Sequence, residues 1–495
     1  MSLGLSNKLR ILQQSPHDFE TAPPSSSDLP AAPEADRWVA SRYNVRASAS
    51  DGRLVLWNSI RGTMSVFSVA QRATIEGLLG QKSFEAPLRG AVKYLFERGF
   101  LVKEGTNEYR RIQLSFGQAH YRSDAFELIL LASEDCNFRC AYCYEDFARG
   151  TMQPWVREGV KKLVESKISH LRYLNIGWFG GEPLYGLTAI EELAPYLQDL
   201  ARRHSVRYTS HMTTNGYLLT PEVADKLLAW GCTTFQITID GLPEDHNRNR
   251  PTRDGQGSFD TILANLKAMT ERPEKQEFSV NVRFNFDQHN SQGFSAFLDI
   301  LERELGHDKR FKVRFHAVGK WGGANDDNLA ICGVNDGWSM VREMKQEVRK
   351  RGLNLGEELT DLKMGSQVCY AARPYNFVIG ASGKLMKCTV DLDKKDRNVI
   401  GHLTEDGRLE TDQDKLALWT EPAFETDTKC QKCVILPVCQ GLHCPQIRMD
   451  TGDSPCSSLR TQVKMDMLEM VDSPYSPGRR PPVTEQPPTQ AVADH

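Results

Sequence analysis

Six alternations of a strand-like and a helix-like segment occupy the middle of this 495-residue chain, from Ala125 to Val318. Such alternation is typical of parallel sheets, because each helix returns the chain to the same edge. The expected strands are Phe126–Ala132, Tyr173–Phe179, Arg207–Thr213, Thr233–Ile239, Phe278–Phe284 and Phe311–Ala317. A closed barrel of this kind has eight units. The pattern therefore predicts an α/β fold, a partial (β/α)6 TIM-like barrel with reactive groups beyond the carboxyl ends of its strands.

Three cysteines follow the first expected strand with the spacing Cys-x3-Cys-x2-Cys: Cys136, Cys140 and Cys143. Three thiolates on one tight loop can hold three irons of a four-iron cluster and leave the fourth iron without a protein ligand. A zinc knuckle and buried thiols are the alternatives, but zinc takes four ligands and usually pairs of Cys-x2-Cys. We therefore interpret the triplet as a [4Fe-4S] site with one open iron.

The spacing, with the aromatic Tyr142 directly before the third cysteine, resembles the radical S-adenosylmethionine (SAM) superfamily. In that family the open iron chelates the methionine end of SAM, and an electron cleaves the sulfonium to give a 5'-deoxyadenosyl radical. The resemblance implies SAM as a cofactor, Tyr142 in its binding site, and a reductant such as flavodoxin or ferredoxin.

Gly180-Gly181-Glu182-Pro183 follows the second expected strand and resembles the GGEP motif of the same family. Two glycines let the backbone approach a ligand, and a Glu carboxylate can accept hydrogen bonds from an ammonium group. The resemblance implies that Gly180, Gly181 and Glu182 hold the amino group of SAM. As a bare string the segment would also suit an ordinary turn.

The ends of the third, fourth and fifth expected strands resemble segments that line the SAM pocket in this family. The residues concerned are Thr213, Asn215, Gln236, Thr238 and Arg283. Thr238 is the candidate for the ribose hydroxyls, and the alternative is an ordinary inward-facing barrel residue. Arg283 and Asn285 share one face of the fifth strand by period-two alternation and could reach the carboxylate or the ribose.

Past the barrel, seven further cysteines form an ordered series that randomly buried thiols would not produce. They are Cys369, Cys388, Cys430, Cys433, Cys439, Cys444 and Cys456. The series resembles the SPASM extension of radical SAM enzymes, a small domain with two auxiliary [4Fe-4S] clusters. The chain would then carry three clusters in all. A double zinc ribbon is the alternative.

The same resemblance divides these seven cysteines between two clusters. The distal cluster takes Cys430, Cys433, Cys439 and Cys456, and the cluster nearer the barrel takes Cys369, Cys388 and Cys444. Some family members supply a further cysteine to the second cluster, and this chain has none between Cys369 and Cys388. Either Cys332 completes that site, or the fourth iron is open to water or substrate. Cys232 has no partner spacing and is expected to be a small core residue.

Composition shifts suggest how the chain is divided. Residues 1–37 and 473–495 are rich in proline and small or polar residues, which is typical of flexible tails. Between them we expect four units, namely a winged-helix-like domain over 38–115, the barrel over 120–335, a helical linker over 336–368 and the auxiliary cluster domain over 369–460.

The N-terminal unit is expected to contain a β-hairpin whose turn is Asp51-Gly52. It resembles the winged-helix peptide-recognition domains attached to enzymes that modify ribosomal peptides. This implies that the unit binds a peptide leader by adding it as a strand, with pockets around Tyr43, Val45 and Leu56. A structural cap over the mouth of the barrel is the alternative.

Charge and hydropathy argue against several partners. The formal net charge is −3, from 61 basic and 64 acidic residues, which gives no electrostatic reason to expect nucleic acid or an anionic membrane. No apolar run approaches the length of a membrane span, and charges interrupt the first residues of the sequence. Sparse cysteines with metal-site spacings suit a reducing compartment, so we expect a cytoplasmic protein.

Members of the family with a SPASM extension mostly act on peptides or proteins. The leading hypothesis is therefore an enzyme that matures a ribosomally made precursor peptide by crosslinking or oxidation. In anaerobic sulfatase-maturing enzymes, the second hypothesis, an acidic residue directly follows the cysteine that matches Cys388; here Thr389 stands there, with Asp391 and Asp393 nearby. The third is a non-catalytic iron–sulfur electron carrier, which would not need Gly180-Gly181-Glu182. The sequence assigns no catalytic acid or base.

Overall fold

The structure is a computed structural model that describes residues 36–147, 149–356, 359, 362–392, 396–454 and 456–472. The predicted tail over 473–495 and Asp393 lie outside the described residues, as does the predicted N-terminal tail up to residue 35. Asp36 and Arg37, which the prediction includes in that tail, already belong to the first strand.

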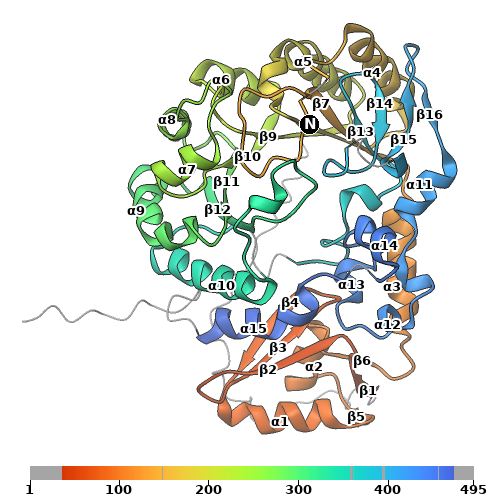
Figure 1. Cartoon of the computed structure of the whole chain (residues 1–495). Helices are drawn as coiled ribbons and strands as arrows, with labels where there is room; N and C mark the ends of the chain where they lie inside the picture. The colour runs from red at the N-terminus through yellow and green to blue at the C-terminus, as the bar shows by residue number, and fades with distance from the viewer. Residues whose placement is uncertain are drawn as a thin grey trace, which may run out of the picture.

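The middle of the chain forms an open parallel sheet with helices on its outer side (Figure 1). Its strands are β7 (Ala125–Ser133), β8 (Tyr173–Gly180), β9 (Arg207–Thr214), β10 (Cys232–Thr238), β11 (Ser279–Phe286) and β12 (Phe311–Ala317). Each strand begins and ends within two residues of its predicted bounds. All five neighbouring pairs from β7 to β12 are parallel, so the predicted partial barrel is confirmed.

Helices between these strands, and α10 after the last of them, pack along the outside of the sheet. They are α4 (Pro154–Lys167), α5 (Leu187–Arg203), α6 (Pro221–Ala229), α7 (Pro243–Asn249), α8 (Phe259–Thr270), α9 (Phe294–Leu305) and α10 (Val334–Lys350). Local sequence sets their ends. In α6, Thr220 caps the helix by accepting from Val223 N, Pro221 occupies the first turn, and Gly231 follows with φ +76°.

The main apolar core lies between the sheet and these helices. The inner face of the sheet differs from this core because some of its side chains are polar. Outward-facing strand residues such as Leu130 and Trp178 are fully buried. Several inward-facing residues are polar and half-buried, among them His211 and Gln236. The inner face of the strands thus carries polar side chains as well as apolar ones, whereas the outer face is largely apolar.

Strands from the C-terminal part extend the barrel sheet. β13 (Asn376–Ile379) pairs in parallel with β7, and β14 (Lys384–Met386), β15 (Val399–Leu403) and β16 (Leu409–Thr411) follow in antiparallel order. The result is one ten-stranded sheet. An open barrel leaves the edge of β7 unpaired, and β13 covers that edge. The sequence patterns did not predict this extension.

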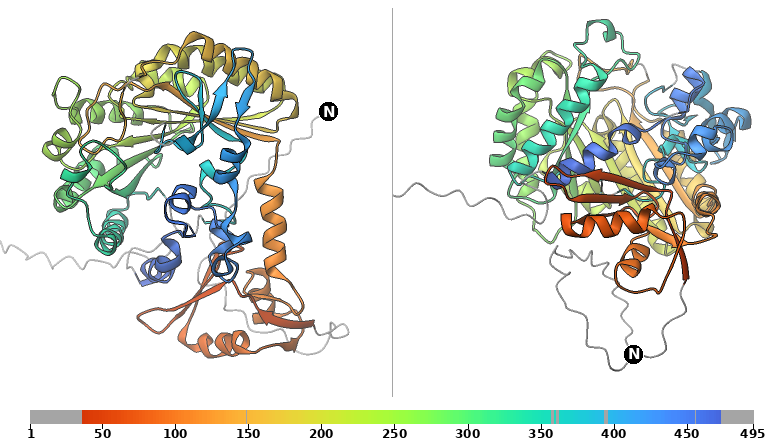
Figure 2. Two further views of the ribbon diagram at one scale, coloured as in Figure 1. Left: turned by 45° about the vertical axis from the view of Figure 1, so that its right-hand side comes forward. Right: turned by 90° about the horizontal axis from the view of Figure 1, so that it is seen from below.

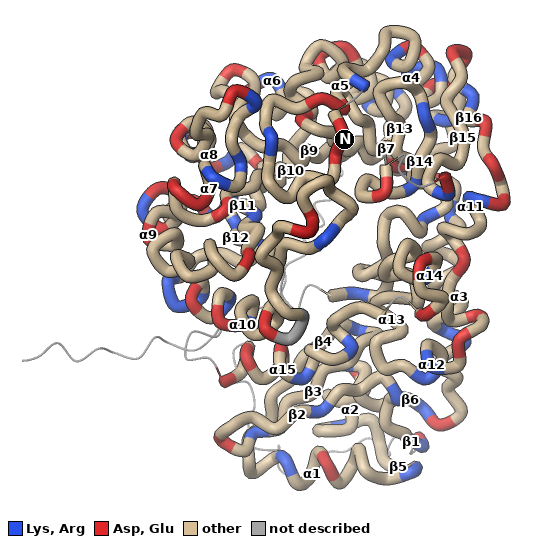
Figure 3. Tube along the Cα trace, in the orientation of Figure 1, with Lys and Arg blue, Asp and Glu red and all other residues tan. Residues whose placement is uncertain are grey.

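The remaining C-terminal elements are short helices and one longer one: α11 (Gln413–Thr420), α12 (Thr428–Gln431), α13 (Leu436–Cys439), α14 (Pro445–Thr451) and α15 (Leu459–Asp472). No helix in the described part of the chain is both long enough and apolar enough to cross a membrane. Figure 3 shows basic and acidic residues interspersed along the trace of the molecule.

The N-terminal unit consists of two three-stranded antiparallel sheets with two helices, and α3 (Glu108–His120) joins it to the barrel (Figure 2). Its elements are β1 (Asp36–Ala40), β2 (Asn44–Ser48), β3 (Leu54–Asn58), β4 (Thr63–Phe67), α1 (Val69–Gly80), β5 (Phe84–Ala86), α2 (Gly90–Glu97) and β6 (Leu101–Lys103). β2 and β3 pair antiparallel on either side of Gly52, which has φ +85°. The predicted hairpin is therefore confirmed.

The predicted leader pockets around Tyr43, Val45 and Leu56 are wrong. The exposed fractions of these side chains are 0%, 4% and 0%, so none can contact a peptide. Tyr43 packs in a cluster with Phe424 of the C-terminal part, and Val45 packs against α15. The N-terminal unit uses this face of the hairpin to dock on the C-terminal helices. Sequence periodicity marked the face as apolar but could not say what covers it.

Candidate functional site

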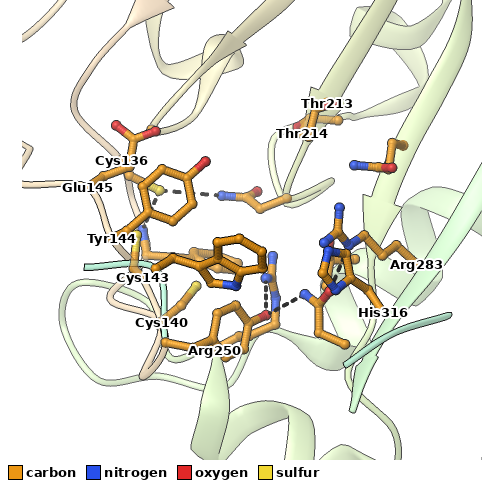
Figure 4. Close-up of a pocket in the computed structure, with 18 of the residues that line it drawn as sticks. Cys136, Cys140, Cys143, Tyr144, Glu145, Thr213, Thr214, Arg250, Arg283 and His316 are labelled. Atoms are coloured by element: carbon orange, nitrogen blue, oxygen red, sulfur yellow. Dashed lines mark hydrogen bonds between the residues drawn. The ribbon is translucent and has the colours of Figure 1, made fainter. Parts of the chain in front are cut away.

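The three cysteines of the loop after β7 line one cavity of about 210 Å³ at the carboxyl ends of the barrel strands (Figure 4). The predicted residues that line it are Cys136, Cys140, Tyr142, Cys143, Gly180, Gly181, Thr213, Asn215, Gln236, Thr238 and Arg283. Of the site residues predicted in the barrel, Glu182 does not line this cavity. Residues from the whole arc of β7 to β12 thus meet where the topology predicts a site.

The thiols of this loop suit an iron–sulfur cluster in their chemistry. All twelve cysteines of the chain are free thiols. Cys136 Sγ accepts a hydrogen bond from Phe138 N at 3.3 Å and contacts Asn215 Nδ2 at 3.9 Å. Burial raises the pKa of each thiol in the triplet, that of Cys143 to about 12, so metal binding would have to displace these protons.

A site for a single metal ion would need several ligands that converge on one point. Among the described residues, no group of three or more His, Cys, Asp or Glu side chains is placed to hold one metal ion. A four-iron cluster does not ask for such convergence, since each thiolate binds a separate iron.

The two glycines of the GGEP segment bring it against the cysteine loop. Gly180 has φ +124°, and a Cβ built on it would lie 2.0 Å from Ser133 O. A Cβ on Gly181 would lie 2.7 Å from Asp135 O and 3.1 Å from Cys136 Cβ. A side chain at either position would push the two loops apart. Glycine is therefore needed at both positions for the packing of the two loops, in addition to any close approach to a ligand.

Glu182 lies directly behind this loop and is fully buried. Its Oε1 accepts hydrogen bonds from Leu184 N at 3.0 Å and Thr214 Oγ1 at 2.6 Å, and its Oε2 accepts one from Asn215 N at 2.7 Å. Burial raises the pKa of this carboxyl, and the three hydrogen bonds oppose the rise. These contacts brace the turn after β9. The predicted contact of Glu182 with the SAM amino group stays a prediction.

A buried network on the opposite side of the cysteine loop contains two residues that sequence reasoning missed. Tyr142 OH donates to Asp240 Oδ2 at 2.5 Å and accepts from Arg250 Nη1 at 2.8 Å and Asn285 Nδ2 at 3.0 Å. Burial raises the pKa of Asp240 to about 6, and Arg250 opposes the rise. The network ties Tyr142, and with it the cysteine loop, to β10, β11 and the end of α7.

A sequence signal was present for one of these two missed residues and absent for the other. Asp240 lies in the Gln236–Gly241 segment that resembles a SAM-pocket segment of the family, so the sequence already marked its position as part of the site. Arg250 follows α7, and nothing in its local sequence marks it. Its Nε is buried and has no hydrogen-bond partner among the described residues, although the residue lines the cavity. A bound group with an acceptor would suit this donor.

Arg283, His316 near the end of β12 and Trp321 after this strand close the far side of the cavity. Arg283 Nε donates to Asn285 Oδ1 at 2.7 Å, and burial lowers the pKa of its guanidinium, with Arg314 as a further cause. His316 and Trp321 were not predicted. Their rings meet edge to face, with centroids 6.0 Å apart. The aromatic pair narrows the cavity from the open edge of the barrel.

The cysteines assigned to the distal cluster lie together. Cys430, Cys433, Cys439 and Cys456 line one cavity of about 570 Å³ between α12, α13 and the start of α15. Arg460 Nη1 donates to Cys456 Sγ at 3.2 Å, which would help to hold a thiolate there. Four converging thiol positions fit a four-iron cluster as the resemblance implies.

The cysteines assigned to the other auxiliary cluster are also neighbours. The thiols of Cys388 and Cys444 both contribute to the raised pKa of Cys369, for which burial is the largest cause. Cys369 N donates to Leu442 O at 2.8 Å, which brings the two loops together. Cys332 lies elsewhere: its Sγ contacts Met340 Sδ at 3.8 Å. Cys232 is fully buried in β10, as predicted for a core residue.

We expect Cys332→Ala to leave the iron content of anaerobically reconstituted protein unchanged, because this thiol lies with Met340 and not with the three auxiliary cysteines. Iron assay of the variant beside wild type checks this. Cys444→Ala is the matched comparison and should lose about four irons, one cluster. Loss of about four irons from Cys332→Ala would instead show that the loop before α10 moves to complete the site.

Comparison with known proteins agrees with this geometry. Residues 130–280 match the family model described as Radical SAM superfamily. The chain is 25% identical over 221 residues to Radical SAM cyclopropyl synthase TigE of Paramaledivibacter caminithermalis, a match that covers 40% of this chain and 45% of that protein. It is 24% identical over 353 residues to the cysteine-type anaerobic sulfatase-maturating enzyme of Clostridium perfringens, covering 66% of this chain and 90% of that protein.

The chain spans less than half the length of several curated relatives that it matches. A solved structure described as native anSMEcpe with bound AdoMet and Cp18Cys peptide superimposes with a TM-score of 0.51 at 20% identity. The superposition covers 69% of this chain and 95% of that one, and it shows a shared fold. Because residues 130–280 match this family and contain the cysteine triplet, the GGEP segment and most of the residues that line the cavity, this part of the chain is a radical SAM domain.

Proposed function

We propose that this chain is a radical SAM enzyme that modifies a side chain of a ribosomally made peptide or protein, by crosslinking or oxidation. The observation that carries the proposal is the convergence of three free thiols, the GGEP loop and the ends of β9 to β11 on one cavity. With a cluster and SAM bound, reductive cleavage of SAM would supply a 5'-deoxyadenosyl radical as the hydrogen-abstracting agent.

The chain's own residues would hold and orient these groups. Cys136, Cys140 and Cys143 would bind the cluster, while Tyr142 and its buried partners fix the loop that carries them. The glycine loop and Thr238 would face SAM. His316 and Trp321 would restrict water at the open edge of the barrel, which protects a reactive intermediate. Two auxiliary [4Fe-4S] clusters on the C-terminal cysteines belong to the same proposal.

A peptide or protein substrate is supported by the names of related proteins. The matches include two enzymes described as sulfatase-maturating, and the solved structure with the shared fold holds a peptide beside AdoMet. Electrons would come from a reductant such as flavodoxin or ferredoxin, and the reducing conditions that free thiols require suit a cytoplasmic location.

An anaerobic sulfatase-maturing activity is the second candidate, because the matches to such enzymes cover 63% and 66% of this chain. Local geometry argues against it at one position. Asp391, the nearest described acidic residue after Cys388, is buried and accepts from Gln446 Nε2 at 2.6 Å and Arg397 Nη2 at 3.2 Å. A carboxylate held in this way is poorly placed to take a proton from a substrate.

The proposal is tested with anaerobically reconstituted protein, SAM and dithionite. We expect about 12 iron atoms per chain, formation of 5'-deoxyadenosine, and a mass change in a short peptide encoded beside the gene. Modification of the Cp18Cys peptide in place of that peptide would favour the sulfatase-maturing candidate. Clusters without any 5'-deoxyadenosine would favour the electron carrier, and stoichiometric zinc with little iron would refute all three hypotheses.

For leader binding by strand addition, the binding surface that we propose is now the edge of β4, because the hairpin residues predicted to form the pockets are buried. This strand ends its sheet, and Val66 on it is 39% exposed. We expect Val66→Lys to raise the KM for a full-length precursor about tenfold, a loss of about 1.4 kcal/mol of binding, with an unchanged Tm. Leu88→Lys is the control, since Leu88 is 40% exposed but lies before α2. Equal effects of both variants would exclude the β4 edge.

A further inference from the structure

Polar residues at the inner end of the barrel form a connected chain across three strands. Closed barrels of this type fill their interior with layers of Val, Ile and Leu. Here β7, β8 and β9 instead turn Glu127, Asn175 and His211 inward, all half-buried. Their outward-facing neighbours along the strands are apolar and fully or almost fully buried: Leu128, Ile176 and Met212. Together with the apolar Ile129 and Phe179, the inward-facing residues give the inner face both polar and apolar walls.

Hydrogen bonds fix the orientation of the histidine. Asn175 Nδ2 donates to Glu127 Oε1 at 3.0 Å, and His211 Nδ1 lies 3.2 Å from Asn175 Oδ1. Because the amide oxygen can only accept, His211 Nδ1 carries the hydrogen of this bond. Burial lowers the pKa of His211, although Glu127 opposes the shift, so the ring is neutral. Its Nε2 then presents a lone pair.

The imidazole of His211 packs against Gly177 and borders a cavity. A Cβ built on Gly177 would lie 2.7 Å from His211 Nε2, so a side chain at position 177 would displace the ring. Both residues line a cavity of about 160 Å³. A cavity of this size has room for several waters or for one small side chain.

The position of this cavity connects it to the reaction site. It shares Phe179 and Thr213 with the cavity that the cysteine triplet lines. Its opposite wall is formed by Tyr370 and Thr389, whose hydroxyls lie 2.7 Å apart. These two residues directly follow auxiliary cysteines in the sequence. A side chain in the cavity would lie between the proposed radical source and the auxiliary domain.

We propose that this cavity is the subsite for the substrate residue that is modified, and that it selects a side chain with an O–H or N–H donor, which His211 Nε2 accepts. The inference deepens the proposed function and rests on it. Glu127 and Asn175 act as positioning residues, since they hold the imidazole with its Nδ1 protonated and its Nε2 free to accept. The oxygens of Tyr370 and Thr389 offer further polar contacts opposite His211.

A purely structural role would look different. If the chain of hydrogen bonds served only to tie β7, β8 and β9 together, His211 Nδ1 alone would be needed, and Nε2 would have no ligand to meet. His211→Asn keeps a donor near the position of Nδ1 but removes Nε2, whereas His211→Gln keeps an acceptor near the position of Nε2. The two variants separate the roles.

The test uses the SAM-bound holoenzyme and diethyl pyrocarbonate, which acylates neutral imidazole nitrogens with a free lone pair. His211 acylation is followed by mass spectrometry with N-acetylserinamide, N-acetylasparaginamide or N-acetyltyrosinamide present, and with N-acetylalaninamide and N-acetylvalinamide as controls. We expect at least one of the amides with a side-chain donor to slow acylation of His211 about tenfold at about ten times its Kd. The two amides with apolar side chains should give no protection.

Three results would overturn the subsite: no acylation of His211, equal protection by donor-bearing and apolar amides, or no protection at all. With peptide substrate, His211→Gln should keep more turnover than His211→Asn while both keep the wild-type Tm; the reverse order would also refute it. The protection assay does not depend on SAM cleavage. If it succeeds while no 5'-deoxyadenosine forms, the proposed function fails, and the cavity remains only a binding site for a side chain with an O–H or N–H donor.

Discussion

Replacing Cys136, Cys140 and Cys143 together by alanine is expected to remove about four of about 12 iron atoms per chain and to abolish reductive cleavage of SAM. These thiols line the cavity that also contains the GGEP glycines and the ends of β9 to β11. Without them no iron would be held where SAM must bind. Iron assay and chromatographic detection of 5'-deoxyadenosine measure the two effects separately.

Cys232→Ala is the control for this experiment, because Cys232 is also a free thiol and, like Cys136, is buried, but it lies inside β10. It should keep both iron and SAM cleavage. Retention of all iron in the triple variant would show that the triplet is not a cluster site. Loss of iron with full SAM cleavage would show that cleavage occurs elsewhere in the protein.

Glu182→Ala is expected to destabilise the protein by about 3 kcal/mol or more, because three buried donors lose their acceptor and each costs about 1–3 kcal/mol. The donors are Leu184 N, Thr214 Oγ1 and Asn215 N. Loss of the buried charge offsets part of this cost. Asn215 would also lose its position beside Cys136, so SAM affinity should fall. Chemical denaturation and SAM binding by calorimetry measure the two consequences.

Glu191→Ala provides the matched control. This Glu forms an ion pair with Lys226 at 2.7 Å on the surface, where its side chain is 39% exposed. A surface change of this kind usually alters stability by less than about 0.5 kcal/mol. If Glu182→Ala were as mild as the control, the turn after β9 would not depend on the carboxylate. If it kept full stability but lost SAM binding, the predicted contact with the SAM amino group would be favoured.

Much of the barrel could be predicted because its information is local. Strand and helix periodicity repeats within ten to twenty residues, and all six parallel strands followed from it with small errors at their ends. The cysteine triplet and the GGEP segment are short motifs whose spacing carries their chemistry. Topology then places both at the carboxyl ends of the strands, which the structure shows.

Residues whose roles depend on distant partners were not predictable in the same way. Arg250 forms a hydrogen bond with Tyr142, which lies 108 positions earlier in the sequence, and the local sequence around either residue does not predict this contact. Glu182 was recognised, but its three protein donors are visible only in the fold. Tyr43 and Val45 were read as exposed pockets, because an apolar strand face does not reveal whether a ligand or another domain covers it.

The sequence by itself determined the radical SAM motifs, the parallel barrel and the thiols that can hold clusters, since each depends on neighbours along the chain. Tertiary structure alone decided that β13 extends the sheet at β7, that Cys332 lies apart from Cys369, and that His211 faces a cavity closed by Tyr370. The pairing of β13 with β7 and the cavity between His211 and Tyr370 join segments more than 100 residues apart along the chain. Such contacts form only when folding buries apolar faces together, and local periodicity does not encode which faces meet.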